Sequence, residues 1–267
     1  MSRWFPEHVV LRIGDAPRAL PAAWPSAPDG VDATLAGGGS AGQSKCDAAL
    51  RAFEHDLDQR GLKRGTRITC VVAGDGVRYR VVPWNEELAG PAQRQLLAEH
   101  CFKEAYGDAA HGWTVRQHTV RHGAASLACA LDAALLDRLD AMAQARRLEL
   151  VSVQPSLMHA CNQAPPRLEP GPFWFVCIET LWTTALLMSP TEPLHVKPLP
   201  SAGLDLSLSL DREGFALGLE GPRCPVHAVQ AIGAPVSPDT AGARASGWRS
   251  VDLHGNDVSP RLHRRAA

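Results

Sequence analysis

VRYRVVPWNEEL, at residues 77–88, opens the stretch from Val77 to Gln154 that decides the fold. Polar and apolar residues alternate in 77–82, which predicts a strand, and apolar residues recur at helical spacing in Pro91–Tyr106. Further strands are predicted at 113–120, 126–131 and 148–153, and a second helix is predicted from Asp132 to Arg147. Alternating strands and helices with short connections are typical of an α/β domain.

Upstream of this stretch, the sequence predicts a strand, a long loop, a helix and a strand, at 8–13, 16–44, 46–59 and 67–72. Gly74-Asp75-Gly76 is a strong turn signal, so we expect 67–72 and 77–82 to form a hairpin. The run 37–44 comes within one residue of a phosphate-binding P-loop, but Gln43 stands where that motif requires Lys. We therefore interpret 37–44 as part of the flexible loop.

Prolines mark a boundary before the second half of the chain, at Pro165-Pro166 and again at Pro170-Gly171-Pro172. Beyond them the sequence predicts a mostly β region. Its expected strands are 173–178, 183–188, 194–199, 207–210, 215–219, 226–232 and 248–253, with a loop at 234–247.

Composition narrows the functional classes. The 267 residues are 45% hydrophobic and 21% charged, as in an ordinary globular protein, and can bury a core. A formal net charge of −1 gives no electrostatic reason to expect nucleic acid or an acidic membrane as a partner. No apolar run approaches the roughly 18 residues of a membrane span. We expect a cytoplasmic protein that meets a membrane only through a partner.

The sequence lacks recognisable catalytic and metal-binding motifs. Its seven cysteines are odd in number and scattered, several of them in apolar runs, which is typical of inert buried thiols in a reducing compartment. No Gly-x-Ser-x-Gly nucleophile elbow occurs. His118 and His122 are four apart, but in a β-like segment rather than a helix, and their possible co-ligands Cys101 and Cys129 look core-bound. The sequence therefore predicts no catalytic, cofactor-binding or metal-binding residue.

The end of the strand at 77–82 is the best candidate for a binding site. Pro83 cannot donate a ladder hydrogen bond, which places it at a strand end or a sheet edge. An exposed Trp84 beside it would anchor a partner peptide, with Val82, Pro83 and Trp84 forming the contact. The alternative is that Trp84 packs under the helix that follows.

Several segments carry a family resemblance. They are Val77–Trp84, Ala105–Gly107 with Gly112-Trp113, Leu127–Asp132, and Leu150–Pro155 with Asn162. Together they resemble the PilM and GspL-type proteins, which have actin-like folds and serve type IV pili and type II secretion. The resemblance covers roughly 46–253 and is most specific at 77–162.

This resemblance implies an α/β, actin-like (RNase H-like) fold of two lobes. The first lobe would span 1–164 with a small α/β subdomain inserted at about 83–154, and a truncated, mostly β second lobe would span 173–254. Residues 255–267 would form a basic tail. PilM-like proteins hold a short peptide of a PilN-type inner-membrane protein, so the expected function is a scaffold that binds such a partner.

Actin-like proteins hold ATP between two glycine-bearing phosphate loops built around Asp-x-Gly. The corresponding places here are Ile13-Gly14-Asp15-Ala16, where the order is reversed, and Ile178-Glu179-Thr180-Leu181, which lacks glycine. The resemblance therefore implies a degenerate, non-enzymatic member without a cofactor. Two alternatives stay open: an active actin-like ATPase with unorthodox phosphate loops, and an unrelated α/β enzyme.

Overall fold

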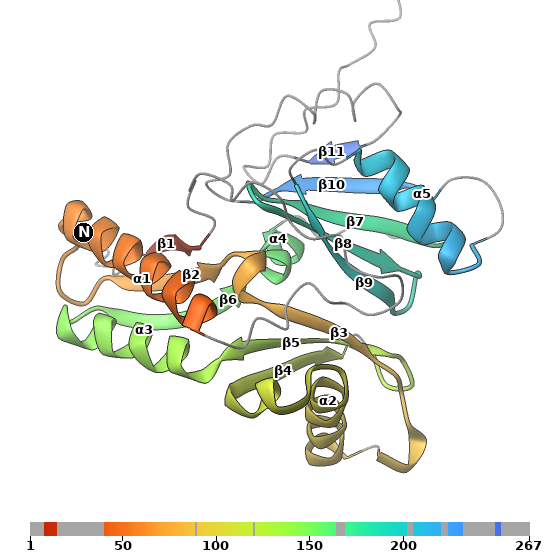
Figure 1. Cartoon of the computed structure of the whole chain (residues 1–267), viewed down its shortest axis with the longest axis horizontal. Helices are drawn as coiled ribbons and strands as arrows, with labels where there is room; N and C mark the ends of the chain where they lie inside the picture. The colour runs from red at the N-terminus through yellow and green to blue at the C-terminus, as the bar shows by residue number, and fades with distance from the viewer. Residues whose placement is uncertain are drawn as a thin grey trace, which may run out of the picture. The chain divides into compact units, whose positions relative to one another are not determined.

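The computed structural model describes residues 8–14, 40–88, 90–119, 121–163, 169–201, 205–219, 224–231 and 249–251 (Figure 1). The chain divides into two compact units, Met1–Pro155 and Ser156–Ala267, and each is described by itself. The predicted loops at 16–39 and 234–247 lie outside the described residues.

A parallel sheet forms the centre of the first unit. It contains β1 (His8–Ile13), β2 (Arg67–Val72) and β6 (Glu149–Pro155), in the order β1-β2-β6. Its middle strand is buried from Ile68 to Val72, as expected where both faces of a parallel strand are covered. The strand predictions at 8–13, 67–72 and 148–153 are thus confirmed.

Two helices connect these parallel strands and run side by side. They are α1 (Ser40–Arg60) and α3 (Ala133–Ala145). Three ion pairs join the two helices: Asp47–Arg138, Glu54–Arg146 and Asp58–Arg146. Because the paired residue numbers increase together along both helices, α1 and α3 are parallel. On its inner side α1 buries Leu50, Phe53 and Leu57, the helical stripe predicted from sequence. The predicted loop at 16–44 is wrong at its end, because α1 begins at Ser40 and includes residues 40–44.

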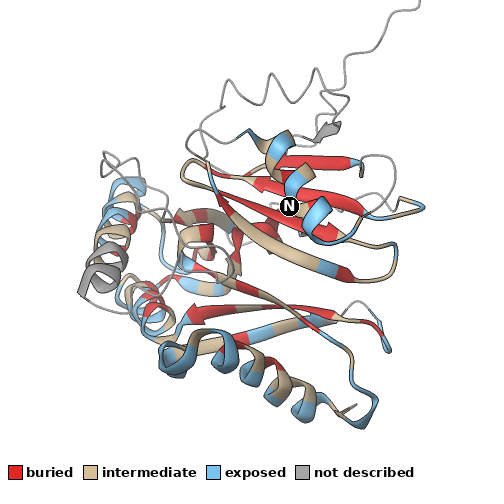
Figure 2. Cartoon of the chain, turned by 45° about the vertical axis from the view of Figure 1, so that its right-hand side comes forward, coloured by how far each residue is buried: buried red, intermediate tan, exposed pale blue. Residues whose placement is uncertain are grey.

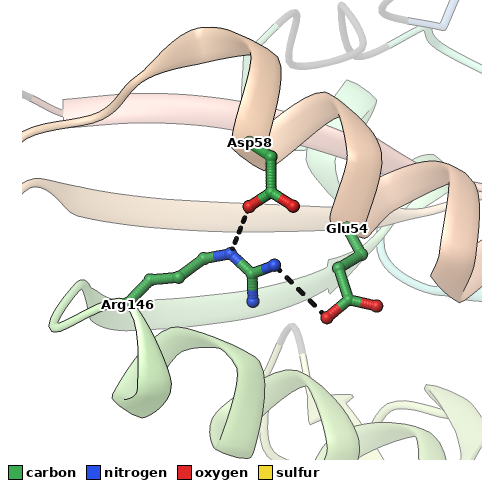
Figure 3. Close-up of polar contacts among 3 residues, drawn as sticks. All are labelled: Glu54, Asp58 and Arg146. Atoms are coloured by element: carbon green, nitrogen blue, oxygen red, sulfur yellow. Dashed lines mark hydrogen bonds and ion pairs between the residues drawn. The ribbon is translucent and has the colours of Figure 1, made fainter.

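Arg146, the residue that ends α3, clamps the two helices together (Figure 3). Its Nε donates to Asp58 Oδ1 at 2.9 Å and its Nη2 to Glu54 Oε1 at 3.2 Å. The hydrogen bond from Arg146 lowers the pKa of Asp58, and the same bond raises the pKa of Arg146. Both effects favour the ion pair over the separated charges.

We expect Arg146→Ala to lower the stability at pH 7 and to lower it less as the pH falls. Because the pKa of Asp58 is lowered on folding, its contribution is present above the ordinary carboxyl pKa of about 4 and is lost as the folded protein is protonated. Denaturant unfolding of wild type and variant between about pH 3 and pH 7 measures this. Arg51→Ala, an exposed arginine of the same α1, is the matched control. An equal loss at both ends of the pH range would contradict the pairing.

Arg147, the residue after Arg146, has a backbone conformation in the left-handed region, with φ 56°. Leu148 N donates to Ala143 O at 2.9 Å and Arg147 N to Gln144 O at 3.0 Å. These two bonds form a Schellman motif, whose left-handed position glycine usually occupies.

Arg147→Gly is expected to stabilise the protein. A non-glycine residue in the left-handed region destabilises the folded state by about 1–2 kcal/mol, and glycine removes this strain. Glycine's greater freedom in the unfolded chain offsets about 0.5–1 kcal/mol of that gain. The net gain should lie between about 0 and 1.5 kcal/mol in the free energy of unfolding, measured by urea denaturation. Arg147→Ala keeps the strained Cβ and should give no such gain. If both variants behave alike, backbone strain is not the cause.

A second, antiparallel sheet completes the first unit. It contains β3 (Arg78–Val82), β5 (Ser126–Asp132) and β4 (Trp113–Thr119), in the order β3-β5-β4. The predicted hairpin between 67–72 and 77–82 is wrong, because β2 pairs with β1 and β6 whereas β3 pairs with β5. The turn signal is instead a short 3-10 helix, η1 (Gly74–Gly76), that carries the chain from one sheet to the other. Residues 83–154, expected as an insertion, include β6, which lies in the sheet of β1 and β2.

Helix α2 (Pro91–Tyr106) packs on one face of this sheet and has the bounds predicted from sequence. Its side chains Ala98 and Phe102 form a buried cluster with Val82, Val115, Ala128 and Ala130 of the three strands. Gly107 ends α2 with φ 60°, as expected. The segments η2 (Glu86–Leu88) and η3 (Gly107–Gly112) flank the helix. Asp132 caps α3 as predicted, accepting a hydrogen bond from Ala134 N.

The second unit is built on a five-stranded sheet. After α4 (Ser156–Gln163), which the sequence did not predict, come β7 (Phe173–Ile178), β8 (Trp182–Met188) and β9 (Pro193–Pro200). Then follow α5 (Leu206–Ala216), β10 (Val226–Gln230) and β11 (Arg249–Val251). The order is β11-β10-β7-β8-β9, with β7, β8 and β9 antiparallel and β10 and β11 parallel to β7.

The strands predicted at 207–210 and 215–219 are wrong, because helix α5 occupies this part of the chain. The alternation Ser207-Leu208-Ser209-Leu210 suggested one apolar strand face, but in the helix the two leucines point apart. Leu210 is 4% exposed and Leu208 is 57% exposed. Asp205 caps the first turn, and Gly218, at φ 68°, ends the last one.

Candidate functional site

The outer edge of β3, with Pro83 and Trp84 after it, is called here the β3 edge surface. In the sheet order β3-β5-β4, the described strands give β3 a partner on one side, β5. Pro83 follows the last residue of β3 directly and is exposed, so its predicted place at a strand end is confirmed. An edge strand directs every second residue's N–H and C=O outward, where another strand can pair with them.

The hydrogen bonds of Val115 indicate which residues of β3 point outward. Val115 O accepts from Gln95 Nε2 and from Arg116 Nη1, both at 3.0 Å, and these donors fill its two lone pairs. Val115 therefore directs its main chain away from its neighbour on β5, Ala130. By the alternation of an antiparallel ladder, Ala130 then faces Arg78 of β3, and Val81 directs its N–H and C=O to the outer edge.

Val82 lies beneath this edge rather than on it. Its side chain is 2% exposed and belongs to the apolar cluster under α2. Of the three residues predicted to contact a partner, Val82 thus supports the strand from inside, while Pro83 and Trp84 reach the surface.

Trp84 is half-buried between two side chains that sequence reasoning did not connect with it. The guanidinium of Arg94, from α2, lies 5.5 Å from the Trp84 ring centroid. The ring of His122, from the turn between β4 and β5, meets it edge-on at 4.4 Å. Trp84 therefore packs against the following helix, as one of the two interpretations held, and still keeps part of its surface accessible.

Neither neighbour carries a local sequence signal. Arg94 is ten residues from Trp84, and His122 comes from a different turn. Their positions depend on the docking of α2 and on the register of β4 against β5, which a single sequence does not specify. Arginine over tryptophan is a favourable cation–π pair, worth about 0.5–1 kcal/mol when exposed.

Two other antiparallel edges are less open than β3. On β4, the side chains of Gln95 and Arg116 cover the central carbonyl, that of Val115. In the second unit, Ser201 N donates to Leu181 O, which fixes the alternation of the β8–β9 ladder so that Pro198 and Pro200 face outward. Proline has no N–H, so the β9 edge lacks donors at these positions.

The first place expected for a phosphate loop is a tightly packed turn. Gly14, at φ 91°, follows β1, and a Cβ added there would lie 3.0 Å from Asp75 Oδ1 and 3.1 Å from Ala73 Cβ. Ala73 N donates to Ile13 O at 2.8 Å, which ties the end of β1 to the end of β2. The glycine is thus required by close packing of two turns. Asp15 and Ala16 lie outside the described residues.

The second place is the hairpin between β7 and β8, whose main chain is engaged within the protein. Glu179 N donates to Trp182 O at 2.9 Å. Ser201 Oγ donates to Glu179 O at 3.0 Å, and Ser201 N donates to Leu181 O at 2.9 Å. Glu179 itself is 3% exposed. The turn is therefore held by Ser201, and it contains no glycine that would let a phosphate approach the backbone.

The described cysteines and histidines give no sign of a metal centre or an activated thiol. Within the described ranges, no group of three or more His, Cys, Asp or Glu side chains could hold a metal ion. Burial raises the pKa of Cys70 and of Cys161 to about 12, and that of Cys129 to about 11. These thiols are protonated at neutral pH and are poor nucleophiles.

Comparisons with known proteins identify the fold. No protein-family model and no curated sequence matches the chain. Among solved structures, it is similar to a chain of the PilM–PilN type IV pilus biogenesis complex, with TM-score 0.52 and 14% identity over 88% of this chain and 79% of that one. It is also similar to a Bacteroides thetaiotaomicron protein with an actin-like ATPase fold, with TM-score 0.50 and 12% identity over 79% and 77% of the two chains.

A further similarity is to the cytoplasmic domain of EpsL, an inner-membrane component of the type II secretion system of Vibrio cholerae. Its TM-score is 0.46, with 13% identity over 68% of this chain and 67% of that one. The protein therefore has an actin-like fold, and the predicted fold class is confirmed. None of the helices in the described ranges combines the length and the apolar character needed to cross a bilayer.

Proposed function

We propose that this protein is a non-enzymatic, cytoplasmic scaffold of a type IV pilus or type II secretion-like assembly platform. It binds a peptide or domain of a PilN-type inner-membrane protein and reaches the membrane only through that partner. The observation that carries the proposal is the actin-like fold, which this chain shares with a member of the PilM–PilN complex. In this proposal the lobes are 1–164 and 173–254, and 255–267 is a basic tail. The insertion expected at about 83–154 is limited to residues before β6, because β6 pairs with β2 in the first lobe.

The β3 edge surface supports binding of an extended peptide. Val81 directs its main chain outward, and a peptide strand laid along β3 would pair with it by β-augmentation. Trp84, next to the end of the strand, supplies the side-chain anchor. Because Arg94 and His122 already hold its ring, little conformational freedom is lost on binding.

The two turns in place of the phosphate loops support a role without catalysis. One packs Gly14 against Asp75, and the other engages Glu179 and Leu181 with Ser201. Neither presents the Asp-x-Gly arrangement that brings backbone N–H groups and a magnesium-organising acid to a nucleotide.

We expect the purified protein to bind a synthetic peptide of the cytoplasmic N-terminus of the PilN-type protein from the same genome. Trp84→Ala should weaken this binding about tenfold or more, since an anchoring tryptophan contributes more than about 1.4 kcal/mol. Val81→Pro should weaken it as well, because proline removes an outward N–H that the fold does not use. Isothermal titration calorimetry measures both effects.

Leu96→Ala is the matched control, because Leu96 is 64% exposed on α2 and lies about 200° around the helix from Arg94, which contacts Trp84. Unchanged unfolding midpoints for all three variants would show that the fold is intact. Full affinity in both Trp84→Ala and Val81→Pro would place the peptide elsewhere. If the wild type does not bind the peptide, the proposal that a PilN-type protein is the partner is wrong.

An actin-like ATPase is the second candidate function, favoured by the fold shared with the Bacteroides thetaiotaomicron protein. Our expectation is that Mg-ATP up to millimolar concentration gives no saturable heat and no rise in unfolding temperature. A dissociation constant of 1 mM corresponds to only about −4 kcal/mol. Binding in the micromolar range that Glu179→Ala abolishes would overturn the non-enzymatic proposal and make the β7–β8 turn a phosphate loop.

A further inference from the structure

Helix α5 exposes large apolar side chains on its outer side. Phe215 is 88% exposed, the highest value among the described large apolar residues, and Leu208, at 57%, is third after Leu96. Exposed residues of this helix stand in pale blue in front of the buried strands of its sheet (Figure 2). Two large apolar side chains exposed on the same side of one helix form a patch of the kind that marks an interaction site.

The opposite side of α5 is anchored to the second unit. Leu210 lies in the core cluster of the five-stranded sheet. Glu213 pairs with Lys197 of β9 at 3.5 Å and with His195 at 3.7 Å. These contacts fix the rotation of the helix about its axis, so the outward direction of Leu208 and Phe215 is a property of the fold.

The outer stripe of α5 is complementary to itself. Leu208, Asp211, Arg212 and Phe215 follow the i, i+3, i+4, i+7 spacing of a helix contact face. A two-fold axis between Asp211 and Arg212 would place Leu208 on Phe215 of a second copy, and Asp211 on Arg212. Isologous contacts have this property: each residue meets the residue that meets it.

We propose that α5 is a self-association surface that binds α5 of a second copy of this chain in an antiparallel pair. The ends of the contact are apolar, and its centre carries one acid and one base from each copy, so both charges gain an opposite partner. Asp211 already has a contact within its own chain. A carboxylate has enough lone pairs to accept another donor, so that contact can persist.

The pairing should be weak and dependent on concentration. A standard protein interface buries about 800 Å² per partner, which is more than one face of an 11-residue helix provides. The proposal is independent of peptide binding at β3, because it uses only residues of the second unit.

Sedimentation velocity of the full chain, from micromolar to millimolar concentration, tests the association. The wild type should shift from monomer to dimer, and Phe215→Glu should raise the dissociation constant about tenfold or more. Arg212→Asp should weaken the dimer, because it faces Asp211 of the other copy with a second acid. The double variant D211R/R212D restores opposite charges and should recover the dimer.

Cysteine cross-linking tests the antiparallel register. Under mild oxidation, a mixture of Leu208→Cys and Phe215→Cys should give a disulfide-linked dimer, whereas either variant alone should give none beyond the wild-type background. Unchanged unfolding midpoints control for folding of each variant.

Three results would overturn the proposal. These are a wild type that stays monomeric at every concentration, a dimer unaffected by Phe215→Glu, and a disulfide between two Leu208→Cys chains. Flotation with phosphatidylglycerol-containing vesicles that Phe215→Glu abolishes, in a protein that stays monomeric, would assign the stripe to a lipid surface instead.

Discussion

Parallel strands cannot be joined by a tight turn, and the connection between them must leave the sheet and return, nearly always with a right-handed sense. Because β1, β2 and β6 follow one another across the first sheet, this constraint places α1 and α3 on the same face. The ion pairs of Arg138 and Arg146 become possible only there. The long connection from β2 to β6 also leaves room for the sheet of β3, β5 and β4.

Local signals predicted most elements of the fold. The bounds of α2, the Asp132 cap and the strands of both units follow from periodicity, caps and breakers that act within a few residues. Strand pairing was not predicted where it depended on distant segments. The Gly74–Gly76 signal was recognised as a change of direction, but whether β3 returns to β2 or joins β5 is decided by residues some fifty positions further along. Helix α5 was not predicted for another reason. Leu208 is apolar but exposed, so the hydrophobic pattern of this segment does not indicate which residues are buried.

The features of the candidate site also divide into those that the sequence predicts and those that depend on tertiary packing. Pro83 at a strand end could be predicted because proline lacks an N–H, and this holds in any fold. The surroundings of Trp84 could not, because Arg94 and His122 arrive from a helix and a turn whose docking is a tertiary event. Likewise, the absence of glycine at Glu179 was visible in the sequence, while the engagement of that turn by Ser201, twenty-two residues later, was not. Residue type thus indicated which phosphate-loop residues these turns lack in sequence, and packing determined the contacts that the described turn residues make.

The outward prolines of β9 bear on how the protein behaves when crowded. A sheet edge with ordinary residues can recruit the edge of a neighbouring molecule and start an amyloid-like stack, a hazard that grows with local concentration. Pro198 and Pro200 interrupt that edge with positions unable to donate. At high local concentration, this edge of the second sheet therefore resists edge-to-edge pairing with neighbouring copies of the chain.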